Sequence, residues 1–381
     1  MEQLPDILQY LFSGLATGSI YAIVAVGFTI IFSSTQVVNF AQGEFVMLGA
    51  MGTYMLTAWN WHNADYAGLH LPLWLAIAGA VLLAALIGML LGCLLIRPLE
   101  TSPFLLLLIT FAGGWFCYQN LVLLRNPDPL TPAMPLPAFI GLAVVTFALL
   151  GVAIYLLIGV ILGKIRSGKE ASVPSQIIVT VGASMLFQGI ASQLWGKDAV
   201  SVDGLASGAL LWQLPNTPYP VAMEYQKFWV MGLTLAMVLL LTLFFNGTII
   251  GKAMRAVSVN RHGARLMGIN VPRMVIGAFA LSAALGALAG AAIAPISCGY
   301  YNMGTMMGLK GFAAAIVGGL GNFTGSVIAG LLLGVMESLA AGYISSDYKD
   351  AFAFIVLLVV LIISPHGLPA LIKRYRKAAA Q

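Results

Sequence analysis

Three polar side chains stand close together inside an otherwise apolar stretch near the start of the chain. Asn39, Gln42 and Glu44 lie within six residues of one another, beside Gly43. Polar groups at membrane depth are costly, and they usually face a protein interior or a water-filled path. This spacing is typical of an unwound or re-entrant segment, whose freed backbone groups need protein or water partners. We interpret the segment as a polar lining. The open alternative is that these groups only tie helices together, or that Glu44 lies at the membrane interface.

A second interruption of the same character lies near the other end of the chain. The run VGGLGNFTG, from Val317 to Gly325, breaks an apolar stretch with glycines and one asparagine. Two broken apolar segments in corresponding halves of a chain favour a transport site near the membrane midplane, built from repeats. The polar side chains that we expect along such a path are Asn39, Gln42, Glu44, Gln188, Asn322 and Glu337.

No set of residues in the sequence favours catalysis. The three cysteines lack metal-ligand spacing, and HExxH, GxSxG and Walker A patterns are all missing from the sequence. We therefore expect no enzyme activity, no metal and no cofactor in this chain. The histidines fall in loops or near the ends of apolar spans; they are His62, His70, His262 and His366.

The composition places the chain among α-helical proteins that cross the membrane many times. Hydrophobic residues make up 60% of the chain and charged residues only 8%, with a mean hydropathy of +0.96. A soluble domain carries about a quarter charged residues. We expect a single domain over residues 1–381 with about eleven membrane segments, including re-entrant half-helices. The expected segments are 7–32, 37–58, 73–96, 103–124, 138–162, 173–195, 228–250, 274–297, the half-helix 311–320, 326–341 and 351–364.

The distribution of basic residues predicts the orientation of these segments. The net charge is +5, and the lysines and arginines concentrate in a few loops and the C-terminal tail. Basic loops stay on the cytoplasmic side, so we expect the N-terminus outside and the C-terminus inside. The same concentration indicates membrane topology, and it argues against a nucleic-acid surface.

The loop over residues 251–273 holds five basic residues and no acidic one. It also has the signals of a short helix between two spans: Ser258 or Asn260 could cap its start, and Gly268 could stop it. Pro272 would block any continuation. The alternative is a plain cytoplasmic loop that only sets the topology.

Several stretches of the chain closely resemble the first, LivH-like permease subunit of branched-chain amino-acid ABC importers. The similar stretches are Gly14 to Ala50, Ile177 to Asp198, Met254 to Gly290 and Gly308 to Ala341. The resemblance implies a heterodimer with a second, LivM-like permease in the bacterial inner membrane. It also implies two cytoplasmic ATPases that bind ATP and Mg²⁺, and a periplasmic or lipid-tethered solute-binding protein. Relative to the family, residues 101–172 look like an extra pair of spans.

Within this resemblance, the stretch from Ser258 to Asn270 is similar to the coupling helix that fits a groove on an ATPase. The residues that we expect at this contact are Arg255, Arg261, Ala264, Arg265, Leu266, Gly268 and Ile269. The function that follows is an ATP-driven permease for branched-chain or other hydrophobic amino acids, or for related small solutes. The alternative is a stand-alone channel or ion-coupled carrier for urea or small amides, with Glu44 or Glu337 as a proton or ion site.

Overall fold

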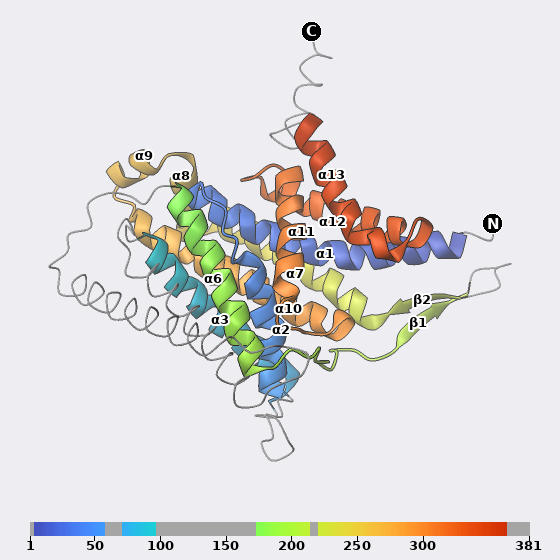
Figure 1. Cartoon of the computed structure of the whole chain (residues 1–381). Helices are drawn as coiled ribbons and strands as arrows, with labels where there is room; N and C mark the ends of the chain where they lie inside the picture. The colour runs from blue at the N-terminus through green and yellow to red at the C-terminus, as the bar shows by residue number, and fades with distance from the viewer. Residues whose placement is uncertain (1–3, 58–70, 97–172, 214–219, 364–381) are drawn as a thin grey trace, which may run out of the picture. The chain divides into compact units, whose positions relative to one another are not determined.

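The structure, a computed structural model, describes residues 4–57, 71–96, 173–213 and 220–363 (Figure 1). The chain divides into two compact units, one formed by residues 1–92 and 197–381 and the other by residues 93–196. The described helix of the second unit is α6 (Val173–Leu194). The helices of the first unit are α1 (Leu4–Thr35), α2 (Gln42–Thr57), α3 (Leu73–Ile96, whose last residues pass into the second unit), α7 (Tyr225–Gly247), α8 (Ile249–Val259), α9 (Arg261–Leu266), α10 (Val271–Ser297), α11 (Met303–Val317), α12 (Phe323–Tyr343), the short 3-10 helix η1 (Ser346–Tyr348) and α13 (Lys349–Ile363).

The predicted helical membrane class is confirmed. Among the described residues, five helices (α1, α3, α7, α10 and α12) are long and apolar enough to cross a membrane. The number of eleven segments and the orientation of the termini stay predictions. The two spans expected within 101–172 lie outside the described residues.

One short element among the described residues is not helical. The loop before α7 contains an antiparallel hairpin of β1 (Ala209–Trp212) and β2 (Val221–Glu224), in which Ala209 pairs with Glu224 and Trp212 with Val221. Both strands are four residues long, and they lie between prolines and glycines that limit helix formation. Strands this short give only a weak signal in the sequence.

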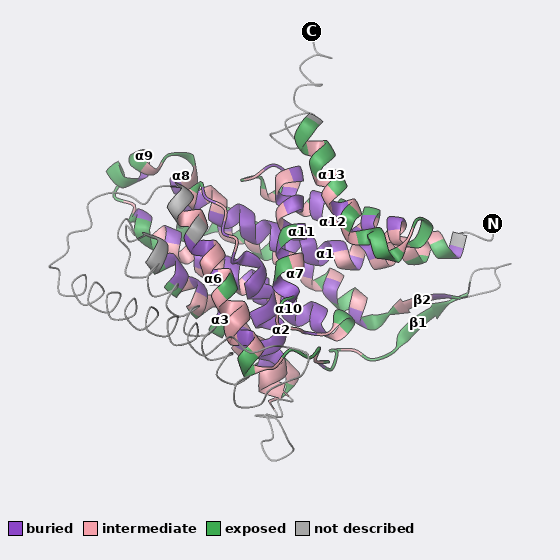
Figure 2. Cartoon of the chain, in the orientation of Figure 1, coloured by how far each residue is buried: buried purple, intermediate pink, exposed green. Residues whose placement is uncertain are grey.

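Helix α1 forms the centre of the first unit, as its buried surface in Figure 2 shows. Its main neighbour is α12, and the two backbones touch because glycines face each other. A Cβ added to Gly334 would lie 2.3 Å from the Cα of Gly18, and one added to Gly14 would lie 2.7 Å from the Cα of Val335. Gly14 and Gly18, four residues apart on α1, therefore let α12 approach the α1 backbone closely.

Helix α2 packs between α10 and α11 through similar close contacts. A Cβ at Gly49 would lie 2.0 Å from the carbonyl oxygen of Ala287, and one at Gly43 would lie 2.0 Å from that of Gly304. No side chain fits between these backbones. The polar side chains Gln42, Glu44 and Thr53 of α2 are buried in this packing.

Helix boundaries differ from the prediction mainly around the interruptions. Helix α11 begins at Met303, eight residues before the expected Gly311, since its glycines pack against other helices and do not break it. The turn that follows covers 318–322, where Gly319 and Gly321 have φ of +83° and +92°. Pro272 lies in the first turn of α10, where proline starts a helix as readily as it ends one.

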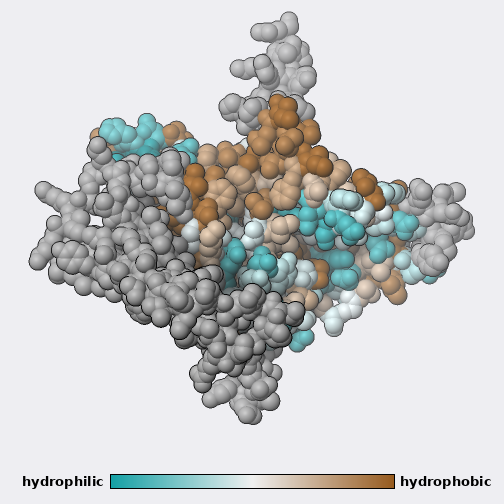
Figure 3. Space-filling view, viewed as in Figure 1, coloured by the Kyte–Doolittle hydropathy of each residue, from teal (hydrophilic) through white to brown (hydrophobic). Residues whose placement is uncertain are grey.

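The exposed surface separates into polar and apolar areas. On the face seen in Figure 3, hydrophilic side chains gather over α8 and α9, whereas α13 presents a hydrophobic surface. Exposed leucines also follow α7, at Leu235, Leu239 and Leu243. An apolar exposed face on spans of this length is typical of contact with lipid.

Candidate functional site

The first interruption lies directly after α1. Gln36 has a φ of +59°, a left-handed conformation that a non-glycine residue rarely adopts, and the helix does not continue through residues 37–41. Asn39 is buried, and its Oδ1 accepts a hydrogen bond from the Ala41 N–H at 3.1 Å. Its Nδ2 has no partner within the described part of the chain. The unwound segment predicted from the sequence is confirmed.

Gln42 is the first residue of α2, and it binds a serine that the sequence analysis did not single out. The Ser282 hydroxyl of α10 lies 2.7 Å from both Gln42 Oε1 and the Gly27 carbonyl oxygen. In return, Gln42 Nε2 donates to the Ser282 carbonyl at 3.1 Å. A Cβ at Gly27 would lie 2.3 Å from that amide nitrogen, so only glycine leaves room for the network. Ser282 could have been noticed as the lone hydroxyl in the apolar run AFALSAALG.

Glu44 is 1% exposed and lies in the first turn of α2. A carboxylate there interacts favourably with the positive end of the helix dipole. Helix α11 covers it closely, since a Cβ on Gly304 would lie 2.6 Å from Glu44 Oε2. Asn39, Gln42 and Glu44 therefore share one buried region at the start of α2.

The second interruption lies against the same end of α1 as the first. Asn322 caps α12, because its Oδ1 accepts the Gly325 N–H at 3.2 Å. One turn along, the Ser326 hydroxyl bonds to that of Thr29 on α1 at 2.8 Å. A Cβ at Gly321 would lie 3.7 Å from the Ser33 hydroxyl, in the last turn of α1. Both interruptions thus gather at the end of α1. The transport site expected at the membrane midplane stays a prediction.

Glu337 belongs to a separate buried cluster of charged groups. Lys310 of α11 lies between two carboxylates, 2.7 Å from Glu337 Oε1 on α12 and 2.5 Å from Asp350 Oδ1 on α13. The Tyr21 hydroxyl donates to Glu337 Oε2 at 2.9 Å, and Lys310 Nζ lies 3.2 Å from that hydroxyl. The sequence analysis missed Lys310, although it is the one charged residue in the glycine-rich run GLKGFAAAIVGG.

Within the first unit, the predicted path residues do not all lie together. Gln188 lies half-buried on α6, in the other unit, with Nε2 3.5 Å from the Ser184 hydroxyl. Within the first unit, Glu337 lies in the charged cluster, and Asn322 is an exposed helix cap. Asn39, Gln42 and Glu44 are the predicted path residues that lie close together, at the start of α2. The role of all six in solute passage stays a prediction.

The basic loop contains the short helix expected from its sequence. Asn260 caps α9, with Oδ1 2.9 Å from the Gly263 N–H, whereas the Ser258 hydroxyl donates back to the Arg255 carbonyl. Of the two candidate caps, Asn260 is therefore confirmed. Gly268, with a φ of +81°, follows the helix and turns the chain toward α10.

Helix α9 is attached to the end of α1 and exposes apolar side chains. The Arg261 guanidinium donates to the Ser34 carbonyl oxygen in the last turn of α1. Ala264 is buried on the inner side, and Leu266 and Met267 are 76% and 83% exposed. Ile269 is half-buried. The exposed apolar pair and the neighbouring Arg265 form the surface that we call the α9 tip.

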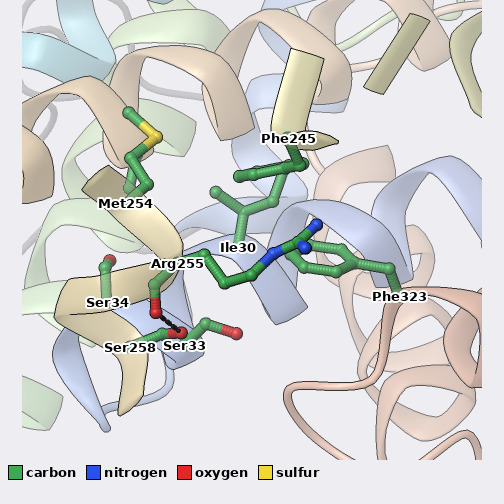
Figure 4. A pocket seen from close by; sticks show the side chains of 9 residues that line it. Ile30, Ser33, Ser34, Phe245, Met254, Arg255, Ser258 and Phe323 are labelled. Atoms are coloured by element: carbon green, nitrogen blue, oxygen red, sulfur yellow. Dashed lines mark hydrogen bonds between the residues drawn. The ribbon is translucent and has the colours of Figure 1, made fainter. Parts of the chain in front are cut away.

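Arg255 lies away from the α9 tip, on α8. Its Nη2 donates to Asn246 Oδ1 at the end of α7, at 2.8 Å. Figure 4 shows its side chain extending toward Phe323, at the start of α12, beside a small hollow also lined by Ser33 and Ser258. Its part in an ATPase contact stays a prediction.

Buried polar groups inside a bundle of apolar helices are typical of proteins that carry solutes across a membrane. The family model described as branched-chain amino acid transport system / permease component matches residues 10–361, and the chain belongs to this family. The permease LivH of the high-affinity branched-chain amino acid transport system of Salmonella typhimurium (strain LT2) is 27% identical over 373 residues, covering 96% of each chain. BraD of Pseudomonas aeruginosa is 26% identical over 371 residues, covering 97% of each. No solved structure matches the chain.

The chain is also similar, over a smaller part of its length, to permeases for other solutes. The ribose import permease RbsC of Haemophilus influenzae is 28% identical over 220 residues, 55% of this chain and 67% of that protein. The chain is therefore a permease subunit of an ABC importer. This family does not support the alternative of a stand-alone channel or ion-coupled carrier.

Proposed function

We propose that this chain forms half of the translocation path for branched-chain or other hydrophobic amino acids, or for related small solutes. The support is that the relatives LivH and BraD, which match this chain over nearly its whole length, are named as branched-chain amino acid permeases. A second permease would supply the other half in the bacterial inner membrane. ATP and Mg²⁺ would be bound by two cytoplasmic ATPase subunits, and a binding protein outside would deliver the solute.

The α9 tip would receive the motion of an ATPase. The observation that carries this proposal is the contact between Arg261 and the Ser34 carbonyl oxygen. Through it, a displacement of α9 would act on the last turn of α1, directly before the interruption that holds Asn39. The exposed Leu266 and Met267 would fill an apolar groove on the partner.

The buried groups at the start of α2 suit a solute that passes loosely. Gln42 and Asn39 offer neutral hydrogen-bonding groups, and Glu44 is the one acidic side chain of this region. Mostly apolar surroundings with a few polar groups are typical of sites for small solutes that carry no large net charge. The solute-binding protein would then largely determine which solute is transported.

The coupling role is tested by replacing Arg261 and Leu266 together with alanine in the assembled transporter. Membrane vesicles that contain the binding protein should lose uptake of radiolabelled leucine, while ATP hydrolysis no longer responds to the loaded binding protein. The matched control replaces Arg273 and Ile249, also exposed, with alanine. Unchanged uptake in the first variant, at equal amounts in the membrane, would refute the coupling role.

A further inference from the structure

A hollow lies in the first unit between α1, α7, α8 and α12. Its volume is about 220 Å³. Its walls are apolar over most of their surface, and they include Leu241 of α7 together with Val327 and Ile328 of α12. We call this hollow the α7–α12 groove. Phe245 and Phe323 also line it, and the centroids of their stacked rings are 4.8 Å apart.

The part of the groove beside these two rings carries a positive charge. Arg255 of α8 lines it, together with Asn246, to which one guanidinium nitrogen donates. A guanidinium has five N–H donors, so others remain for a ligand. Among the described residues, no carboxylate forms an ion pair with Arg255. Lys252, one turn earlier on α8, is also exposed.

Other groups around Arg255 could bind the same anion. The first turn of α12, with Thr324, borders the groove, and the amino end of a helix carries partial positive charge. A second, smaller hollow adjoins Arg255 and Phe323 and is lined by the serines 33, 34 and 258 (Figure 4). The polar end thus offers hydroxyl and amide groups beside an arginine, a combination suited to phosphate oxygens.

The face that surrounds the groove indicates what reaches it. Leu235, Leu239 and Leu243 on α7 are 56–67% exposed, and Ile328 on α12 is 54% exposed. Only lipid or another membrane helix covers such a surface. An apolar helix laid on the groove would enclose the Arg255 charge without compensating it, which is unfavourable. A lipid with an anionic headgroup would fill the apolar part with an acyl chain and neutralise the arginine.

We propose that the α7–α12 groove is a binding site for one anionic phospholipid, with the phosphate on Arg255 and an acyl chain along Leu241, Val327 and Ile328. Basic pockets between membrane helices near the cytoplasmic surface bind such headgroups. The site ties α8 to the outer helices. A bound lipid would therefore hold α8, the helix that leads to α9, in place, whichever solute the transporter carries.

The test measures lipid retention on the complete purified transporter by native mass spectrometry, without any transport assay. We expect dioleoyl-phosphatidylglycerol to be retained over dioleoyl-phosphatidylcholine. Arg255→Gln should reduce that preference about fivefold, the effect of one basic residue at an anionic surface. The control Arg273→Gln removes another exposed charge, outside the groove, and should leave the preference unchanged.

A second pair of variants tests the apolar part of the groove. Val327→Trp should fill it and reduce retention of both lipids, whereas Leu235→Trp, on α7 but outside the groove, should not. Equal retention of the two lipids, or no effect of Arg255→Gln, would overturn the proposal. Loss of the second permease from the Val327→Trp complex would also overturn it, because the groove would then be a contact between subunits. If soluble glycerol phosphate displaced the bound lipid fully, the site would bind the headgroup without an acyl chain. That result would contradict the proposed site.

Discussion

Lys310 of α11 and Glu337 of α12 form an ion pair of 2.7 Å in which only 4% and 9% of the two side chains are exposed. The pair joins two helices that are consecutive along the chain and separated by the interruption at 318–322. Tyr21 of α1 and Asp350 of α13 complete its hydrogen bonds. The cluster therefore connects four helices of the first unit through one ammonium group.

Lys310→Met should destabilise the permease strongly. Two carboxylates would remain without their cation, and removing one partner of a buried ion pair typically costs about 3–5 kcal/mol. We expect a clearly lower Tm for the protein in detergent. Glu337→Gln should have a larger effect than Asp350→Asn, since the Asp350 side chain is 40% exposed and solvent compensates its charge.

Two further variants separate this effect from a general loss of charge. Lys252→Met removes a lysine from an exposed position and should leave Tm unchanged. The double variant of Lys310→Met and Glu337→Gln should be more stable than the sum of the single changes predicts. Additive effects would show that the two groups do not interact in the folded protein.

Gly334→Ala should weaken the packing of α1 on α12. Its added Cβ would lie 2.3 Å from the Cα of Gly18, so that one of the two backbones must move. Overpacking of this kind costs about 1–3 kcal/mol. Gly232→Ala is the matched control, because no atom lies within 4 Å of its Cβ position on α7. There the change should stabilise the helix by up to about 1 kcal/mol. Equal Tm values for both variants would contradict the close packing.

Ser282→Ala should disturb the network at the start of α2. It removes the hydroxyl that bonds to Gln42 and to the Gly27 carbonyl, and a buried acceptor left without its donor costs about 1–3 kcal/mol. We expect a lower Tm together with reduced leucine uptake in vesicles, since Gln42 would lose its fixed orientation. Ser297→Ala, on the same helix, removes only a 3.5 Å contact to its own turn and should change neither. Normal uptake in Ser282→Ala would show that transport does not depend on the orientation of Gln42.

Asn260→Ala should loosen α9 without unfolding the permease. The cap on the Gly263 N–H is lost, which typically costs about 1 kcal/mol of helix stability. ATP hydrolysis in the assembled transporter should then respond less to the loaded binding protein, while the Tm of the permease stays nearly constant. Asn302→Ala is the control, since Asn302 precedes α11 without a side-chain cap and its loss should have no effect. An unchanged ATPase response in Asn260→Ala would indicate that α9 order does not matter for coupling.

Much of the fold follows from local patterns in the sequence. The apolar composition determined the membrane class, and α3 was predicted at its observed bounds because its apolar run ends in clear breakers. The unwound residues before Gln42 and the Asn260 cap of α9 were also predictable. Each depends on groups only a few positions apart, such as the Asn39 side chain and the Ala41 N–H.

The tertiary structure alone decided which distant groups meet. Lys310, Glu337 and Tyr21 are far apart in the chain, and nothing in their local sequences specifies that α1, α11 and α12 pack with these side chains facing one another. The same holds for Ser282 and Gln42 on α10 and α2. The sequence by itself determined that polar groups stand inside membrane helices, because hydropathy and spacing are local properties. Their partners depend on how glycine-rich helices approach, which is set only when the whole bundle packs.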